Sequence, residues 1–216
     1  MINEILFLNK THENAAKMVL DRVLPEFKKK YIISLSGEVE TGKAEIAYVI
    51  GRLLKAENIR VKILYLDSYY KIAPTERTAW RKENGIDKIG TDEYDWEAIN
   101  ESIEAFKKGK KATLPIVDLF TGQVDHLITD FKDIDLLIVA GLYAMKLEQA
   151  DLKVFIENNY KDTMPVQKLS GKEEIDDFRM QILMQEHRVV QSLKKLADFY
   201  IDFDTNLEAL RPTAIE

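Results

Sequence analysis

The chain of 216 residues contains no cysteine, so neither a disulfide framework nor thiolate chemistry is open to it. Its longest apolar run, residues 136–145, is ten residues long, which is too short to cross a bilayer. Basic residues are also in the minority, because 31 Lys and Arg stand against 37 Asp and Glu, for a net charge of −6. This balance argues against a dedicated binder of nucleic acid or of membrane surfaces. We therefore expect no nucleic-acid partner and no membrane association.

The first residues lack the basic start and the long apolar core of a signal peptide, so we expect a cytoplasmic protein. The sequence shows no internal repeat and no low-complexity segment. Hydrophobic residues make up 46% of it, which predicts a globular core. The three histidines, His12, His126 and His187, are far apart and have no metal-ligand spacing. We expect them to have surface or capping roles.

What the sequence does contain is a glycine loop between an apolar run at residues 31–35 and a helical pattern at residues 44–56. The loop reads Ser36-Gly37-Glu38-Val39-Glu40-Thr41-Gly42-Lys43-Ala44. Strand, glycine loop and helix are the context of a P-loop, in which backbone N–H groups and the helix N-terminus face phosphate oxygens. We predict that residues 37–44 hold the phosphates of a nucleotide and that Lys43 reaches the β- and γ-phosphates.

Two features of this loop depart from the P-loop pattern. Ala44 stands where a Ser or Thr hydroxyl would hold Mg²⁺, and Glu38 and Glu40 add negative charge beside the predicted phosphates. The alternative interpretation of the same residues is an ordinary strand-to-helix turn in an α/β protein.

Strand and helix patterns alternate along the rest of the chain. Strands are expected at residues 4–8, 31–35, 60–66, 135–140, 152–156 and 198–203. Helices are expected at residues 13–30, 44–56, 95–108 and 175–196, the first kinked or broken at Pro25. Residues 112–119 and 124–129 flank a turn at residues 121–123 and predict a β-hairpin. Residues 71–94 are expected to be irregular, and residues 161–174 to form either a mobile lid or a plain solvated loop.

Several further stretches follow the loop in a recognisable order. They read Leu66-Asp67-Ser68-Tyr69-Tyr70-Lys71, Asp92-Glu93-Tyr94-Asp95-Trp96, Leu114-Pro115-Ile116-Val117-Asp118 and Ile138-Val139-Ala140-Gly141-Leu142-Tyr143-Ala144, with residues 150–156 and 194–198 after them. In this order, from about residue 31 to residue 204, the chain resembles the uridine kinase and phosphoribulokinase family of P-loop kinases.

This resemblance implies the three-layer α/β fold of P-loop NTPases. We expect a parallel sheet of about five strands with helices on both faces, in which the strand at residues 135–140 lies beside the P-loop strand. The hairpin should project as a flap near the site. The chain is expected to divide into an N-terminal extension, residues 1–30, packed on a P-loop kinase-like domain, residues 31–216.

The resemblance further implies transfer of the γ-phosphoryl group of ATP to a sugar hydroxyl of a nucleoside or related small molecule. Asp67 matches the carboxylate that serves as general base, and Lys43 matches the phosphate-binding lysine. The expected substrate contacts are Tyr69, Tyr70, Asp95 and Asp118. At least one of the two tyrosines should instead pack in the core, and Asp118 and Asp125 also fit exposed turn carboxylates. Self-association of the chain stays open.

The metal positions separate this chain from the family it resembles. The family implies Mg²⁺, held by a P-loop hydroxyl and a Glu at a strand end, but these two positions are Ala44 and Ala140. A methyl group cannot ligate Mg²⁺, which prefers oxygen ligands, so Asp67 would be the remaining carboxylate. Val117 and Gly122 fall where the family carries groups that recognise the pyrimidine. The alternative function is therefore a nucleotide-binding pseudokinase; an unrelated P-loop ATPase is disfavoured by the ordered motifs.

A basic segment in the expected irregular region also allows two interpretations. It comprises Arg77, Trp80, Arg81 and Lys82. These side chains could contact an anionic acceptor or phosphates, but a solvated face is the expected arrangement.

Overall fold

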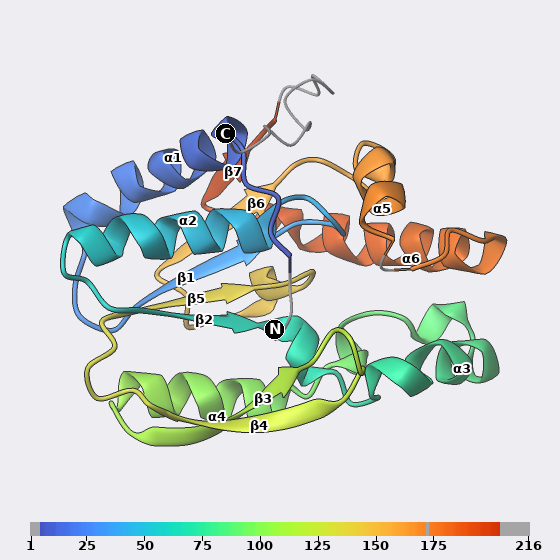
Figure 1. The fold of residues 1–216 in the computed structure, drawn as a ribbon, viewed down its shortest axis with the longest axis horizontal. Coiled ribbons are helices and arrows are strands. Elements are labelled where there is room, and N and C mark those ends of the chain that lie inside the picture. The colour runs from blue at the N-terminus through green and yellow to red at the C-terminus, as the bar shows by residue number, and fades with distance from the viewer. Residues whose placement is uncertain (1–4, 172, 204–216) are drawn as a thin grey trace.

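The computed structural model describes residues 5–171 and 173–203, and among them a five-stranded parallel sheet forms the centre. The strands stand in the order β2-β5-β1-β6-β7 (Figure 1). They are β1 (Tyr31–Ser36), β2 (Val61–Tyr65), β5 (Leu136–Ala140), β6 (Leu152–Ile156) and β7 (Phe199–Ile201). β5 pairs with β1, with Ile33 opposite Ile138, so the predicted neighbour of the P-loop strand is confirmed. The glycine loop therefore starts at the middle of the carboxyl edge, where open α/β sheets bind ligands.

Helices cover both faces of this sheet, as the resemblance implied (Figure 1). α1 (Lys10–Glu26) and α2 (Lys43–Ala56) share one hydrophobic core with the first face. α4 (Trp96–Lys107) packs in a second core on the other face, with Phe106 fully buried. All six residues of β1 are buried, because a strand covered on both faces presents apolar side chains to each layer. The boundary between an extension and a kinase-like domain stays a prediction.

The remaining elements lie around the carboxyl ends of the strands. α3 (Pro74–Asn84), α5 (Met164–Ser170) and α6 (Asp177–Leu193) gather there (Figure 1). The predicted hairpin is present as β3 (Lys111–Val117) and β4 (Val124–Asp130), paired in a separate antiparallel sheet. Its turn touches α3, since a Cβ added to Gly122 would lie 2.7 Å from the side chain of Thr75. The hairpin therefore closes one side of the region above the strand ends.

The N-terminal expectations need correction. Residues 5–8 form no strand, and the remainder of that predicted strand, Glu4, lies outside the described residues. The chain there leads into a helix cap, in which the side chain of Asn9 accepts a hydrogen bond from the backbone N–H of His12 at 3.1 Å. Helix α1 therefore begins earlier than predicted. It ends one residue after Pro25, where proline removes a helical hydrogen bond.

Two segments expected to lack regular structure contain helices. Within residues 71–94, α3 begins at Pro74, a position where the missing N–H of proline costs no hydrogen bond. Within residues 161–174, α5 is followed by Gly171, which adopts a left-handed φ of 59°. Two predicted elements are shorter than expected, because α6 ends at Leu193 and β7 at Ile201. Residues 71–94 and 161–174 are polar overall, so the sequence did not predict the two short helices within them.

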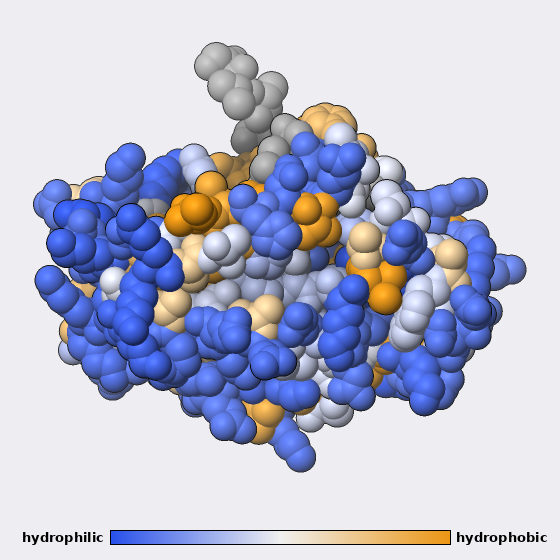
Figure 2. Space-filling view, turned by 90° about the horizontal axis from the view of Figure 1, so that it is seen from below, coloured by the Kyte–Doolittle hydropathy of each residue, from blue (hydrophilic) through white to orange (hydrophobic). Residues whose placement is uncertain are grey.

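The face that carries α4 and the hairpin is mostly hydrophilic. Seen from that side, Figure 2 shows separate hydrophobic spots rather than one continuous patch. Phe120 and Ile128 of the hairpin are nevertheless well exposed, at 81% and 72%. No helix among the described residues is long and apolar enough to cross a membrane. Self-association stays a prediction.

Candidate active site

A cleft of about 640 Å³ opens at the carboxyl edge of the sheet. The glycine loop contributes residues 39–45 to its lining, and α3, α6 and the hairpin turn line it as well. Asp67, in a 3-10 turn directly after β2, and Ala140, the last residue of β5, also face it. Because β2, β5 and β1 are neighbours, their carboxyl ends bring Asp67, Ala140 and Lys43 into one site.

The glycine loop is a tight, internally bonded turn. Glu40 and Gly42 adopt left-handed φ angles of 54° and 81°, and the Thr41 hydroxyl donates to the carbonyl oxygen of Glu38 at 2.9 Å. The Lys43 ammonium group donates to the same oxygen and to Thr41 Oγ1 at 3.3 Å. Burial lowers the pKa of Lys43, and the charge of Asp67 is the largest effect that opposes this shift. Asp67, the predicted base, and Lys43, the predicted phosphate-binding lysine, are therefore close enough to interact electrostatically.

The Glu38 carboxylate forms its hydrogen bonds with residues that do not line the cleft. Only 2% of the residue is exposed. The carboxylate accepts hydrogen bonds from the backbone N–H of Tyr160 at 2.7 Å and from Gln191 Nε2 at 2.8 Å, and it is bonded to His187 Nδ1 at 2.7 Å. Among the described residues, Glu40 lines the cleft and Glu38 does not, although the charge of Glu38 still acts on Lys43.

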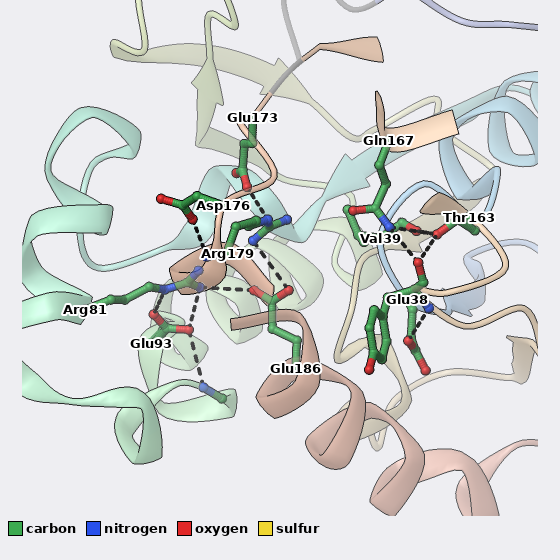
Figure 3. Close-up of polar contacts among 12 residues, drawn as sticks. Glu38, Val39, Arg81, Glu93, Thr163, Gln167, Glu173, Asp176, Arg179 and Glu186 are labelled. Carbon is green, nitrogen blue, oxygen red and sulfur yellow. Dashed lines mark hydrogen bonds and ion pairs between the residues drawn. The ribbon is translucent and has the colours of Figure 1, made fainter. Parts of the chain in front are cut away.

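A network of charges, buried except for Glu173, lies at the α3 and α6 end of the cleft (Figure 3). Arg81 donates to both carboxylate oxygens of Glu93, at 2.7 and 2.9 Å, and lies 3.3 Å from Glu186. Glu186 also pairs with Arg179 at 3.8 Å, and Arg179 pairs with Glu173 at 2.6 Å. Burial raises the pKa of Glu186, although the two arginines oppose the shift. The expectation of a solvated face is wrong for Arg81, which is 5% exposed.

The two tyrosines after Asp67 have different surroundings. Tyr69 packs in the core and donates to Ser102 Oγ at 3.1 Å, and burial raises its pKa to about 12. Tyr70 lines the cleft, with its ring 4.1 Å from that of Tyr94 and 3.5 Å from the Arg77 guanidinium. One tyrosine thus packs in the core, as expected, while a substrate contact by Tyr70 stays a prediction.

The predicted carboxylates divide in the same way. Asp118 is half-buried and lines the cleft, and its side chain also accepts from the backbone N–H of Phe120 at 2.8 Å, so its contact with a substrate stays a prediction. Asp95 caps α4 by accepting from the backbone N–H of Ala98 at 3.0 Å. Asp125 is exposed on β4. Within the described part of the chain, Asp95, Asp125 and Tyr69 are not among the residues that line the cleft, and substrate contacts by Asp95 and Tyr69 stay predictions.

The cleft offers a poor set of ligands for Mg²⁺. Ala44 and Ala140 both line it and present methyl groups where the family would supply oxygen. Across residues 5–171 and 173–203, no group of three or more His, Cys, Asp or Glu side chains could hold a metal ion. Asp67 is left as the carboxylate at the expected metal position. The residues do not fit the metal that the family implies.

Two of the three histidines contact the glycine loop, which sequence reasoning missed. His12 is only 7% exposed, and a Cβ added to Gly42 would lie 2.6 Å from His12 Nε2. The expected surface role is therefore wrong for His12. The His187 side chain is 38% exposed, as a surface role requires, but it also bonds Glu38. His126 is exposed on β4, as expected. No spacing in the sequence links positions 12 and 187 to the loop.

Comparisons with known proteins agree with this geometry. The model of the phosphoribulokinase / uridine kinase family matches residues 32–170. A uridine kinase of Ureaplasma parvum serovar 3 is 31% identical over 136 residues, which cover 60% of this chain and 63% of that protein. A uridine kinase of Schizosaccharomyces pombe is 26% identical over 140 residues, which cover 62% of this chain and 30% of that protein. The matches therefore span less than two thirds of these relatives.

A solved structure of similar fold comes from Bacillus stearothermophilus, where the protein is described as a possible uridine kinase. It superposes with a TM-score of 0.65 at 15% identity, over 88% of this chain and 98% of that one. This likeness shows the fold, and the family match, which covers more than half of the sequence, shows the relationship. The chain belongs to the phosphoribulokinase / uridine kinase family.

Proposed function

We propose that this chain binds ATP at the glycine loop and transfers the γ-phosphoryl group to a hydroxyl of a small molecule, either a nucleoside or a related compound. The observation that carries the proposal is the meeting of Lys43 and Asp67 in one cleft at the carboxyl ends of β1 and β2. Family membership supports the same class of reaction.

In this proposal, the backbone N–H groups of residues 39–44 and the start of α2 hold the phosphates. Lys43 exchanges its hydrogen bonds to Glu38 and Thr41 for bonds to phosphate oxygens. The oxygen of the acceptor hydroxyl forms a bond to the γ-phosphorus, and Asp67 accepts the proton that this hydroxyl loses. The bond between that phosphorus and the bridging oxygen breaks, and ADP leaves with the electron pair.

The acceptor is proposed to occupy the part of the cleft lined by Tyr70, Arg77 and Asp118. They include a cation and a carboxylate, while the Tyr70 ring is already in contact with Tyr94 and Arg77. Val117, where the family carries a group that recognises pyrimidine, offers no side-chain hydrogen bond there. The identity of the acceptor is therefore the least constrained part of the proposal.

A second candidate function is nucleotide binding with little or no turnover. The methyl groups of Ala44 and Ala140 favour it, since phosphoryl transfer relies on a metal to neutralise the charge of the phosphate oxygens. In this form the chain acts as a nucleotide sensor or as an interaction partner.

Two measurements on the intact chain separate these candidates. Thermal unfolding with ATP, with and without Mg²⁺, reports binding, because a ligand of the folded state raises the melting temperature. A coupled ADP-release assay across nucleosides and phosphorylated sugars reports transfer. Release that Asp67→Asn abolishes supports the kinase, whereas stabilisation without release supports the second candidate. If ATP neither stabilises the chain nor is consumed, both proposals are wrong.

A further inference from the structure

The glycine loop is contacted by one histidine from each of two flanking segments. His12 belongs to the first turn of α1, and His187 to α6. Both lie outside residues 32–170, the part that the family model matches. The contacts fall near the two ends of the loop, at Gly42 and at Glu38.

The His187 contact acts through the Glu38 side chain. A carboxylate that is 98% removed from solvent needs several donors, because leaving a buried charge without hydrogen bonds is costly. His187 Nδ1 and Gln191 Nε2 both reach Glu38 Oε1, while the Tyr160 N–H reaches Oε2. The His187 ring also packs on the Tyr160 ring, with centroids 5.6 Å apart. The carboxylate thus ties the start of the loop to α6 and to the segment that precedes α5.

That segment bonds the loop a second time. The Thr163 hydroxyl donates to the carbonyl oxygen of Val39 at 2.9 Å, and Gln167 Nε2 donates to Thr163 Oγ1 at 3.0 Å (Figure 3). Hydrogen bonds therefore hold the side of the loop at Glu38 and Val39.

The His12 contact is one of packing. Gly42 adopts a φ of 81°, and a Cβ placed on it would lie 2.6 Å from Nε2 and 2.8 Å from Cδ2 of the imidazole. The ring edge therefore lies directly against the backbone of Gly42, whose carbonyl accepts the hydrogen bond that begins α2. Helix α1 is itself anchored, since Ala16 and Val19 are fully buried in the core that it shares with α2. His12 thus limits the movement of the backbone just before Lys43.

We propose that His12 and His187 are positioning residues that hold the glycine loop in its phosphate-binding shape from opposite ends. Neither is assigned a contact with nucleotide or acceptor. The expected loss of ATP affinity rests on the proposed function, whereas the expected loosening of the loop does not. The segments before and after the family-matched region would then be required for the loop's shape.

The test compares hydrogen exchange of the amides at residues 37–44 with ATP affinity measured by calorimetry, both on the full chain. His187→Phe keeps a ring beside Tyr160 but removes the donor to Glu38, and His12→Ala removes the contact with Gly42. His126→Ala is the matched control, because that histidine is exposed on β4. We expect faster exchange in the loop and at least about fivefold weaker ATP binding for the first two variants only. His187→Asn, which restores an N–H donor, should recover part of both.

A double-mutant cycle joins His187→Phe with Glu38→Gln. Their effects on exchange should be clearly non-additive if His187 acts through Glu38. The proposal is overturned if loop exchange in His187→Phe and His12→Ala matches that of His126→Ala. Because His12 is buried, His12→Asn replaces His12→Ala if the latter does not fold. Faster loop exchange in a chain that binds no ATP would support the positioning role and refute the proposed function.

Discussion

Lys43 Nζ lies 2.5 Å from the carbonyl oxygen of Glu38, so the ammonium group of the glycine loop is bonded to the loop that carries it. A phosphate oxygen can replace this carbonyl at small net cost, because one hydrogen bond is exchanged for another. The same contact explains how a lysine whose pKa is lowered by burial keeps a partner.

Lys43→Ala should weaken ATP binding by about tenfold to a hundredfold, since it removes a charge-assisted hydrogen bond. Isothermal calorimetry measures the change. Lys55→Ala is the control, because Lys55 is an exposed lysine in the last turn of the same helix. Equal affinities for the two variants would mean that the loop does not hold phosphates.

Ala44→Ser combined with Ala140→Glu should raise ADP release at least about tenfold, because both oxygen ligands return to the metal position. The assay is ADP release with Mg²⁺ against a panel of nucleosides. Adding Asp67→Asn should abolish the gain, since it removes the base and the remaining carboxylate. Robust turnover by the unmodified chain would contradict the argument from the metal ligands. No turnover after restoration would place the defect in the acceptor end of the cleft, at Val117 and Gly122.

Arg81→Met should lower the free energy of unfolding by about 3–5 kcal/mol, because it leaves Glu93 and Glu186 buried without their shared cation. Urea denaturation measures the loss. Arg52→Ala, which breaks an exposed pair with Glu13, should cost less than about 1 kcal/mol. Similar losses for the two variants would show that the buried network contributes little.

His12 should make stability depend on pH. Burial lowers its pKa below 6.5, with the charge of Glu45 and a hydrogen bond involving Phe7 opposing the shift. The contribution of neutral His12 to the free energy of unfolding is fully present above pH 6.5. It is lost as the pH falls from there through the folded-state pKa, because the unfolded chain then binds more protons than the folded chain. His12→Phe should therefore lose less stability than the unmodified chain between about pH 7 and about pH 5. Urea denaturation across this range, with His126→Phe as control, would contradict the idea if all three chains behaved alike.

The sheet and the loop could be predicted because their signals are local. Largely apolar runs mark the buried strands β1 and β5, and the spacing of Gly37, Gly42 and Lys43 marks the turn between β1 and α2. The order of the motifs supplied the neighbours in the sheet. Asp67 could be placed in the cleft on the same grounds, since it directly follows a strand.

The rest depends on partners that are distant in sequence. Arg81 lies in a polar segment, and it is buried because it pairs with Glu186 of α6. No sequence pattern around Arg81 predicts this partner. Glu38 looked unfavourable beside phosphates because His187 and Gln191 could not be assigned to it. The helices α3 and α5 lack an apolar stripe, and the residues that mark their ends, Pro74 at the start of α3 and Gly171 after α5, also fit loops.

The central position of β1 has a consequence for how the chain folds. Ile33 pairs with Ile138 and Leu152, and β2 pairs with β5 rather than with β1. Within the described part of the chain, no two strands of the parallel sheet can therefore pair until the residues of β5 are present. Such distant pairing closes long loops before it gains contacts, which slows folding. During synthesis on a ribosome, the glycine loop should emerge long before the strand that first supports it.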